Sequence, residues 1–453
     1  MTTRLHDATL IVQRDRRPVI LEHHSIVWDG PWITAVGPAP ELVGLPVDDA
    51  IDASRHLVIP GFINTHHHLF QSLTRGLRPV QSAGLFDWLT NLYQRWQNVD
   101  FEALRIAAQV SLAELLLGGC TTTSDHHYLF PAGSDVQLEA VLEAAESLGV
   151  RLHAGRGSMT VGVSRGGLPP DACAEDEAKV LADSQRVLDR FHDPQPGAMR
   201  RIDLAPCAPF NVSPELLRDT AALARERRVL LHTHAAETLD EQAYCLDRFG
   251  CRPIEFLRRR EWLGPDVYLA HCVHLNEEEI GLLAATLTSV AHCPSSNMRL
   301  GSGIPPVRVM LDRGVNVALG VDGSSSNDGG HLVAEARQAL LLQRVAGGPA
   351  ALTPAEAFTL GTLGGATALG RPELGNLAPG LAADLALFRA DDVAFAGAIA
   401  HDPLAALMLC HAPRADRVIV HGRTVVQDGR IALLDAEDLT ARFNARVRER
   451  FAT

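Results

Sequence analysis

Lysine is almost absent from this sequence. Among its 453 residues only Lys179 is a lysine, and it lies in a polar segment whose pattern predicts a helix. Lysine is the residue that forms Schiff bases with carbonyl substrates and that binds nucleotide phosphates in a P-loop. Because no second lysine is present, the sequence disfavours both kinds of site.

Three other features are missing: a positive net charge, a long apolar run and closely paired cysteines. The formal net charge is −13, which argues against nucleic acid or an anionic membrane as a partner. No apolar run approaches the length of a membrane span, and the N-terminal residues lack the basic-then-apolar pattern of a signal peptide. The eight cysteines include no CxxC pair, so we expect free thiols in a reducing cytoplasm.

Strand-like and helix-like segments alternate between residues 57 and 375. Segments such as 101–118 and 214–227 have apolar residues at helical spacing. The strand-like runs are apolar and β-branched, and eight of them can be counted, at 61–66, 121–129, 151–157, 202–209, 229–236, 267–274, 289–295 and 316–323. Eight strand–helix units predict an α/β fold, the (β/α)₈ TIM barrel, whose active site forms at the C-terminal ends of the strands.

Both ends of the chain have a different pattern, in which short alternating strands are separated by turn residues. Such runs lie at 8–12, 25–28, 32–36, 384–388, 417–420 and 424–427. We therefore predict that residues 1–56 and 376–453 pair into one small β-sandwich beside the barrel of residues 57–375. The last part of the chain, rich in Arg, Glu and Ala, predicts a solvent-exposed helix.

Four stretches at or just past the ends of barrel runs, 64–68, 232–237, 270–274 and 320–323, are predicted to form one metal site. Residues i and i+2 of a strand point to the same face, so His66 and His68 can reach one ion, which His234 and Asp322 can complete. Three neutral imidazoles and a carboxylate suit a divalent ion that keeps one position open for water. We expect one ion, Zn²⁺ in the first place, with Fe²⁺ or manganese as alternatives. His67 and His232 are predicted to have structural hydrogen-bonding roles instead.

These motifs resemble those of the amidohydrolase superfamily, in its aminohydrolase branch of guanine-type deaminases and triazine hydrolases. The likeness covers nearly the whole chain. It rests on His66-x-His68 after Pro60-Gly61, His234-x-x-Glu237, His271 and Asp322. Within the branch the chain is most similar to 8-oxoguanine deaminases, in the segments 64–71, 125–131, 156–159 and 292–300.

The resemblance implies metal-dependent hydrolytic deamination of a purine-like ring, with conversion of 8-oxoguanine to urate and ammonia as the first expectation. A bound zinc-like ion makes hydroxide available for the attack, and Asp322, a ligand, can also take the proton from the attacking water. By resemblance, Glu237 would protonate a ring nitrogen as general acid and base, and His271 would hold the water in line. Relatives with two metals carry a modified lysine on the fourth strand, where this chain has none, which favours one ion.

Four further side chains are predicted to contact the substrate. The resemblance supports a contact from the Gln71 amide, Trp88 could stack on a flat ring, and His126 or His127 could bind the ring edge. Arg156 offers a fork of donors to a carbonyl oxygen. Two alternatives stay open: Trp88 as an ordinary core residue, and Arg156 as the ion-pair partner of a barrel carboxylate.

Other functions also fit the same groups. Removal of chloride or an alkylamine from an s-triazine would use the same hydroxide and the same acid. Deamination of a pterin such as isoxanthopterin would need a wider pocket. A scaffold that had lost its chemistry would be indicated by a missing ligand, and none is missing. The expected partner is a small heterocyclic substrate, and relatives of this architecture often form homo-oligomers.

Overall fold

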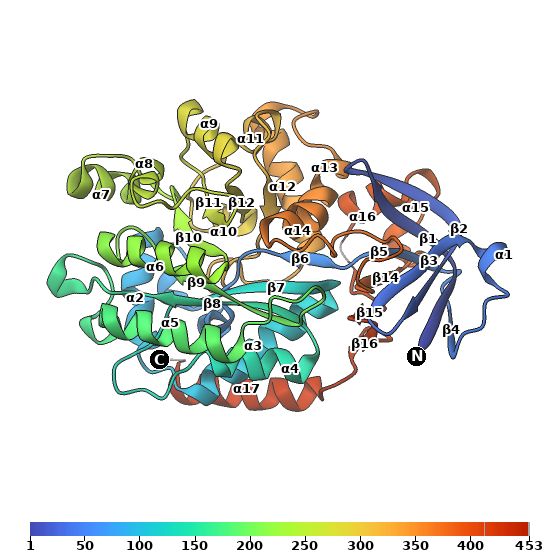
Figure 1. Cartoon of the computed structure of the whole chain (residues 1–453), viewed down its shortest axis with the longest axis horizontal. Helices are drawn as coiled ribbons and strands as arrows, with labels where there is room; N and C mark the ends of the chain where they lie inside the picture. The colour runs from blue at the N-terminus through green and yellow to red at the C-terminus, as the bar shows by residue number, and fades with distance from the viewer. Residues whose placement is uncertain (412, 452–453) are drawn as a thin grey trace.

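The computed structural model describes residues 1–411 and 413–451, which form a barrel and an adjoining sheet (Figure 1). The barrel sheet has eight strands in the order β6 to β13, and each pairs in parallel with the next. They are β6 (Phe62–Asn64), β7 (Cys120–His127), β8 (Arg151–Ser158), β9 (Arg200–Pro206), β10 (Leu231–Ala235), β11 (Val267–His271), β12 (Ser289–His292) and β13 (Val317–Leu319). The amide of Thr65 donates to the carbonyl of Leu319 at 2.9 Å, which links the first strand to the last. The predicted barrel is confirmed.

Helices connect successive barrel strands and cover the outside of the barrel (Figure 1). They are α2 (Leu85–Trp96), α3 (Phe101–Leu117), α4 (Glu139–Leu148), α5 (Glu177–Phe191), α6 (Pro214–Arg227), α7 (Leu239–Phe249), α8 (Pro253–Arg258), α9 (Glu277–Thr286), α10 (Pro294–Arg299), α11 (Val307–Asp312), α12 (Leu332–Gly347), α13 (Pro354–Thr359) and α14 (Gly365–Ala368). Their starts are encoded locally: the Asp100 side chain caps α3, and Asn276 and Glu279 form a capping box on α9. Apolar residues at helical spacing then face the strands.

The two ends of the chain pair in one nine-stranded mixed sheet. Its strands are β1 (Thr2–Arg14), β2 (Arg17–Asp29), β3 (Trp32–Pro38), β4 (Asp49–Asp52), β5 (His56–Pro60), β14 (Leu385–Arg389), β15 (Arg417–Val420), β16 (Arg423–Gln427) and β17 (Arg430–Ile431). β5 joins the two halves because it pairs with β1 on one side and with β14 on the other. The prediction that both ends build one small β domain is confirmed.

Alternation along the strands gives this sheet two apolar faces. Leu385 and Leu387 of β14 pack into a core that lies within the terminal domain and includes residues of β1, β2 and β3. Ala386 and Phe388, which point the other way, belong to the large core shared with the barrel. The sheet therefore folds around a core of its own and also packs on the barrel.

The last helix, α17 (Ala436–Arg450), returns to the barrel along α3 (Figure 1). Leu439 and Phe443 are buried, and Arg446 and Arg450 both pair with Asp100, the cap of α3. The helix predicted to be exposed thus has one buried face. In the part of the chain that the structure describes, none of the helices combines the length and apolar character needed to cross a membrane.

Candidate metal centre and active site

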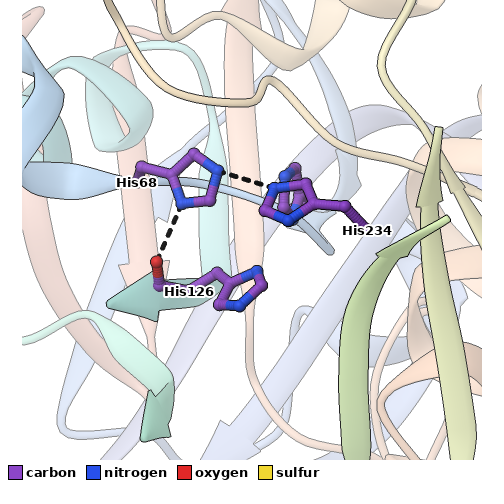
Figure 2. A group of neighbouring side chains, drawn as sticks. His68, His126 and His234 are labelled. Atoms are coloured by element: carbon purple, nitrogen blue, oxygen red, sulfur yellow. Dashed lines mark hydrogen bonds between the residues drawn. The ribbon is translucent and has the colours of Figure 1, made fainter. Parts of the chain in front are cut away.

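Five of the predicted site residues meet at the C-terminal end of the barrel. His66 and His68 follow β6, His234 lies on β10, His271 ends β11, and Asp322 follows β13. Each of the five is at most 8% exposed. The Nε2 atoms of His68 and His234 are 3.0 Å apart (Figure 2), and the Nε2 atoms of His66 and His68 each lie 3.3 Å from Asp322 Oδ1. Ligand atoms from three different parts of the chain thus surround one point.

Hydrogen bonds behind the rings decide which nitrogen faces that point. His68 Nδ1 donates to the carbonyl of His126 at 2.8 Å (Figure 2), and His234 Nδ1 donates to the carbonyl of Cys207 at 2.6 Å. A carbonyl can only accept, so in a neutral ring the hydrogen is on Nδ1 and Nε2 carries a lone pair. The contact between His68 and His234 therefore brings two lone pairs together, an arrangement that a cation between them would stabilise. The residues fit a metal ion.

His66 is oriented by a relay of two further groups. His232 Nδ1 donates to the carbonyl of Tyr268 at 2.7 Å, which leaves His232 Nε2 to accept from His66 Nδ1 at 2.7 Å. His66 Nε2 then also carries a lone pair, and it has no hydrogen-bond partner among the described residues. His232 thus has the hydrogen-bonding role predicted for it. For the buried His67 the structure shows no hydrogen bond to either ring nitrogen within the described residues.

The protonation states match those that bind a divalent ion. Burial lowers the pKa of His66, His68 and His234 and so keeps these rings neutral. Burial opposes ionisation of Asp322, but the close contact with His66 and the nearby His271 and His68 hold the pKa of Asp322 well below the usual range. Neutral imidazoles beside an ionised carboxylate are what metal coordination requires.

Glu237 and His271 lie side by side next to the predicted metal ligands. Glu237 Oε2 lies 3.7 Å from His271 Nε2. Burial raises the pKa of Glu237 to about 7, with Asp322 adding to the effect and His271 opposing it. Burial opposes protonation of His271, but the charges of Glu237 and Asp322 outweigh it and raise the pKa of His271. A carboxyl group with a pKa near neutrality can both donate and accept a proton at pH 7.

The backbone is strained at the turns that carry these groups. His271 and Asp322 have φ angles of 70° and 62°, in the left-handed region that residues other than glycine rarely adopt. Each such conformation costs on the order of 1–3 kcal/mol and persists only where the surroundings enforce it. For Asp322 the enforcement includes a hydrogen bond of 3.0 Å from its own amide to the carbonyl of His66. Two of the predicted site residues are therefore among the strained positions of the backbone.

A narrow cavity begins at these ligands. Besides the site residues, it is lined by Gln71, Leu85, Trp88, Leu89, Tyr128, Cys207, Phe210, Leu300 and Ser326. Gln71 Nε2 donates to the Tyr128 hydroxyl at 3.3 Å, whereas Gln71 Oε1 is buried without a partner among the described residues. Trp88 Nε1 donates to the carbonyl of Ser325 at 3.3 Å, which fixes the indole. Gln71 and Trp88 thus both line the cavity, and Trp88 is also part of the large hydrophobic core.

Arg156 does not line this cavity in the described structure. Its guanidinium pairs with Glu175 at 2.7 Å and with Asp183 at 2.6 Å, and it stacks 3.8 Å above the ring centre of Phe130. Both carboxylates come from the segment around α5, outside the barrel strands. Of the two roles considered for Arg156, the structure shows the ion pair.

His126 lies behind the metal ligands rather than in the cavity. Its ring stacks on that of His234 at 4.7 Å between centroids, and its Nε2 donates to the carbonyl of Ala205 at 2.7 Å. The neighbouring Tyr128 lines the cavity instead. Sequence reasoning missed Tyr128, although it belongs to the segment 125–131 on which the family resemblance rests.

Comparisons with known proteins agree with this geometry. The model of a family described as the amidohydrolase family matches residues 57–425. The 8-oxoguanine deaminase of Pseudomonas aeruginosa is 48% identical over 420 residues, which cover 93% of each chain. An isoxanthopterin deaminase from an unknown prokaryotic organism is 37% identical over 444 residues, covering 93% of this chain and 92% of that one. Among solved structures, atrazine chlorohydrolase from Arthrobacter aurescens complexed with zinc superposes with a TM-score of 0.93 at 35% identity, covering 98% of this chain and 100% of that one.

Proposed function

The chain belongs to the amidohydrolase family, and we propose that it is a hydrolytic deaminase that converts 8-oxoguanine and water to urate and ammonia with the help of one divalent metal ion, Zn²⁺ in the first place. One observation carries the proposal. The lone pairs of His68 and His234 face each other at 3.0 Å, in a cavity that also holds the protonatable Glu237. The similarity to the Pseudomonas aeruginosa enzyme supports the choice of substrate.

Four residues would hold the ion: His66, His68 and His234 through Nε2, and Asp322 through its carboxylate. When bound, the ion would lower the pKa of a water molecule from near 16 to about 7 and so make hydroxide available at neutral pH. A single ion is favoured because β9, the fourth barrel strand, has no lysine that could be modified to bridge two ions.

The chain's own groups would then move the protons. Asp322 would accept the proton of the attacking water. His271 Nε2, which lies 3.7 Å from Glu237 Oε2 and 4.0 Å from Asp322 Oδ2, would orient that water. Glu237 would protonate a ring nitrogen as the new C–O bond forms. As the C–N bond breaks, Glu237 would carry the proton of the added hydroxyl group to the departing amine, and the proton held by Asp322 would restore the acid form of Glu237. General acid–base help of this kind is worth about 10²–10⁴-fold in rate.

The cavity walls suit a flat heterocycle with N–H donors. Trp88, Phe210 and the leucines of the lining supply flat and apolar surface. The free Gln71 Oε1 would accept a hydrogen bond from a ring or exocyclic N–H. A site built around a required hydrogen bond can reject an analogue that lacks it by about 10⁴-fold or more.

Two other substrates belong to the same proposal as alternatives. The relationship to an isoxanthopterin deaminase favours a pterin, and the likeness to the zinc-bound atrazine chlorohydrolase favours an s-triazine. We also propose that the chain works as a homo-oligomer in the cytoplasm, where its eight free cysteines would stay reduced. Residues 57–375 would be the catalytic unit, with 1–56 and 376–453 as the flanking domain.

Ammonia release from the zinc-loaded enzyme tests the proposal. The substrates are 8-oxoguanine, guanine, isocytosine, isoxanthopterin and an aminotriazine. We expect kcat/KM for 8-oxoguanine above about 10⁴ M⁻¹s⁻¹, the ordinary enzyme range, and lower values for the rest. Turnover of a triazine without turnover of purines or pterins would keep the metal site and overturn the substrate.

A further inference from the structure

Two consecutive residues at the start of α10 contact two different groups of the site. The Ser296 hydroxyl donates to Asp322 Oδ2 at 2.5 Å. Asn297 Oδ1 accepts from His271 Nδ1 at 3.0 Å. His271 and Asp322 end β11 and follow β13, the strands on either side of β12, from which α10 begins. Ser296 and Asn297 therefore hold a residue from each neighbouring strand, and we call this pair the α10 clamp.

The local sequence restricts the backbone conformation of the two clamp residues. β12 ends at His292, and Pro294 opens α10, where its fixed φ suits the first helical position. The amide of Asn297 donates to the carbonyl of Cys293 at 3.0 Å, which puts both clamp residues in the first turn. Ser296 and Asn297 are both fully buried. Their side chains therefore leave the helix directly above the barrel end.

A buried carboxylate supports the clamp from behind. Glu335 of α12 accepts from the amide of Ser295 at 3.2 Å and from the side-chain amide of Asn327 at 2.8 Å. Ser295 precedes the clamp, and Asn327 belongs to the loop that carries Asp322. Glu335 thus ties the start of α10 to that loop.

The hydrogen bond from Ser296 gives the two oxygens of the Asp322 carboxylate different contacts. Oδ2 accepts from Ser296 and also from the Ser326 hydroxyl at 3.1 Å. Oδ1 lies 3.3 Å from the Nε2 atoms of both His66 and His68. With Oδ2 held by two hydroxyl groups, the carboxylate cannot rotate freely, and Oδ1 stays directed at the metal ligands.

Asn297 fixes the direction in which His271 presents its second nitrogen. An amide oxygen can only accept, so His271 carries a hydrogen on Nδ1. His271 Nε2 is then the atom that faces Glu237 and Asp322. Because φ of His271 is in the left-handed region, a contact from outside its own strand is needed to hold the ring there.

We propose that Ser296 and Asn297 are positioning residues: Ser296 sets the orientation of the Asp322 carboxylate, and Asn297 sets the orientation of the His271 ring. The proposal rests on the proposed function for its catalytic half only. Partners of metal ligands typically change metal affinity or activity by about 10–100-fold when removed. The two clamp residues act on different groups, so their removal has different consequences.

Zinc affinity tests the Ser296 half without any substrate. The metal-free full chain is titrated with Zn²⁺ against a chromophoric chelator, as wild type, S296A and S295A. We expect S296A to bind zinc about 10–100-fold more weakly. We expect S295A to match wild type, since Ser295 contacts Glu335 through its backbone amide, which alanine retains. Equal affinities for all three would overturn this half. If S296A does not fold, S326A removes the other hydroxyl donor to the same oxygen and carries the same expectation.

Steady-state kinetics test the Asn297 half. We expect N297L to lower kcat by about 10–100-fold while KM and zinc affinity stay at the wild-type values, and N297D, which keeps an acceptor oxygen, to lose less. Equal losses in N297L and N297D, or a matching loss of zinc affinity, would show general disruption and overturn it. If wild type releases no ammonia from 8-oxoguanine, the proposed function fails; the zinc titrations still decide on Ser296, and the kinetics are run on whichever heterocycle of the panel is turned over.

Discussion

Both ends of the barrel contain buried polar side chains, but their hydrogen bonding differs. At the C-terminal end of the strands, His66 Nε2, Gln71 Oε1 and Glu237 Oε1 are buried without a hydrogen-bond partner in the described structure. At the opposite end, Arg151 pairs with Asp384 at 3.0 Å and donates to the carbonyl of Ala198 at 2.7 Å.

A second buried arginine at the N-terminal end of the strands, Arg371, also has hydrogen-bond partners. Arg371 donates to Glu373 at 2.7 Å and to the carbonyl of Ala198 at 2.8 Å, and it is fully buried. Because native proteins satisfy most buried polar atoms, unpaired atoms gathered at one point indicate a ligand, whereas a paired network indicates stability. The difference assigns catalysis to one end of the barrel and attachment of the terminal domain to the other.

The largest effect, on kcat, is expected at the C-terminal end of the barrel strands, where the unpartnered atoms gather. Glu237→Gln keeps the shape of the side chain but cannot exchange a proton, so kcat should fall about 10²–10⁴-fold. The bound metal and the melting temperature should not change, as metal analysis and calorimetry would show. Wild-type turnover in this variant would remove Glu237 from the acid–base role.

At the N-terminal end of the barrel strands, where Arg151 pairs with Asp384, a substitution should lower the stability of the fold and leave catalysis unchanged. Asp384→Ala leaves the buried Arg151 without its carboxylate, which costs about 3–5 kcal/mol in the free energy of unfolding. Denaturant titration measures this loss, and the zinc affinity of the folded variant serves as the control. A loss of zinc affinity without a loss of stability would reverse the roles given to the two ends.

A buried carboxylate near the site sharpens the contrast with Asp384. Glu335 is bound by amide groups and has no arginine partner among the described residues, and burial raises its pKa from 4.5 to about 7. The folded state therefore binds this proton more tightly than the unfolded state, and stability is lost as the pH rises from 4.5 through about 7. Relative to Glu335→Gln, wild type should lose up to about 3 kcal/mol over this range. Identical stability curves for the two proteins would show that Glu335 does not titrate in this window.

The smallest effect concerns the free acceptor of Gln71. Gln71→Leu removes the buried oxygen that has no partner among the described residues, together with the Nε2 donor to the Tyr128 hydroxyl, so the free energy of unfolding should fall by no more than about 1 kcal/mol. If that oxygen binds the substrate, KM should rise about tenfold, the value of one hydrogen bond. Unchanged KM with a larger loss of stability would make Gln71 a structural residue.

The sequence was sufficient for the barrel because its signals are local. Strands buried on both faces read as apolar runs, and each of the eight predicted runs overlaps one strand from β6 to β13. The metal ligands could be predicted for the same reason: His66 and His68 are separated by one residue, and His234 and Asp322 lie near the ends of strand-like runs.

Contacts across the fold were not predictable in this way. Arg156 is paired by carboxylates from the segment around α5, and no periodicity of its own strand indicates them. Ser296 and Asn297 lie 26 residues from Asp322 and His271, respectively. They were visible only as part of a family motif, and their partners depend on how neighbouring strands line up in the barrel.

The place of β5 between β1 and β14 has a consequence for biosynthesis. A ribosome delivers β5 before the barrel and β14 after it, so the terminal sheet can be completed only when almost the whole chain has been made. Until then β5 has an open edge, and open edges pair readily with other chains. The strong negative charge of the chain, −13, would keep neighbouring nascent chains apart during that wait.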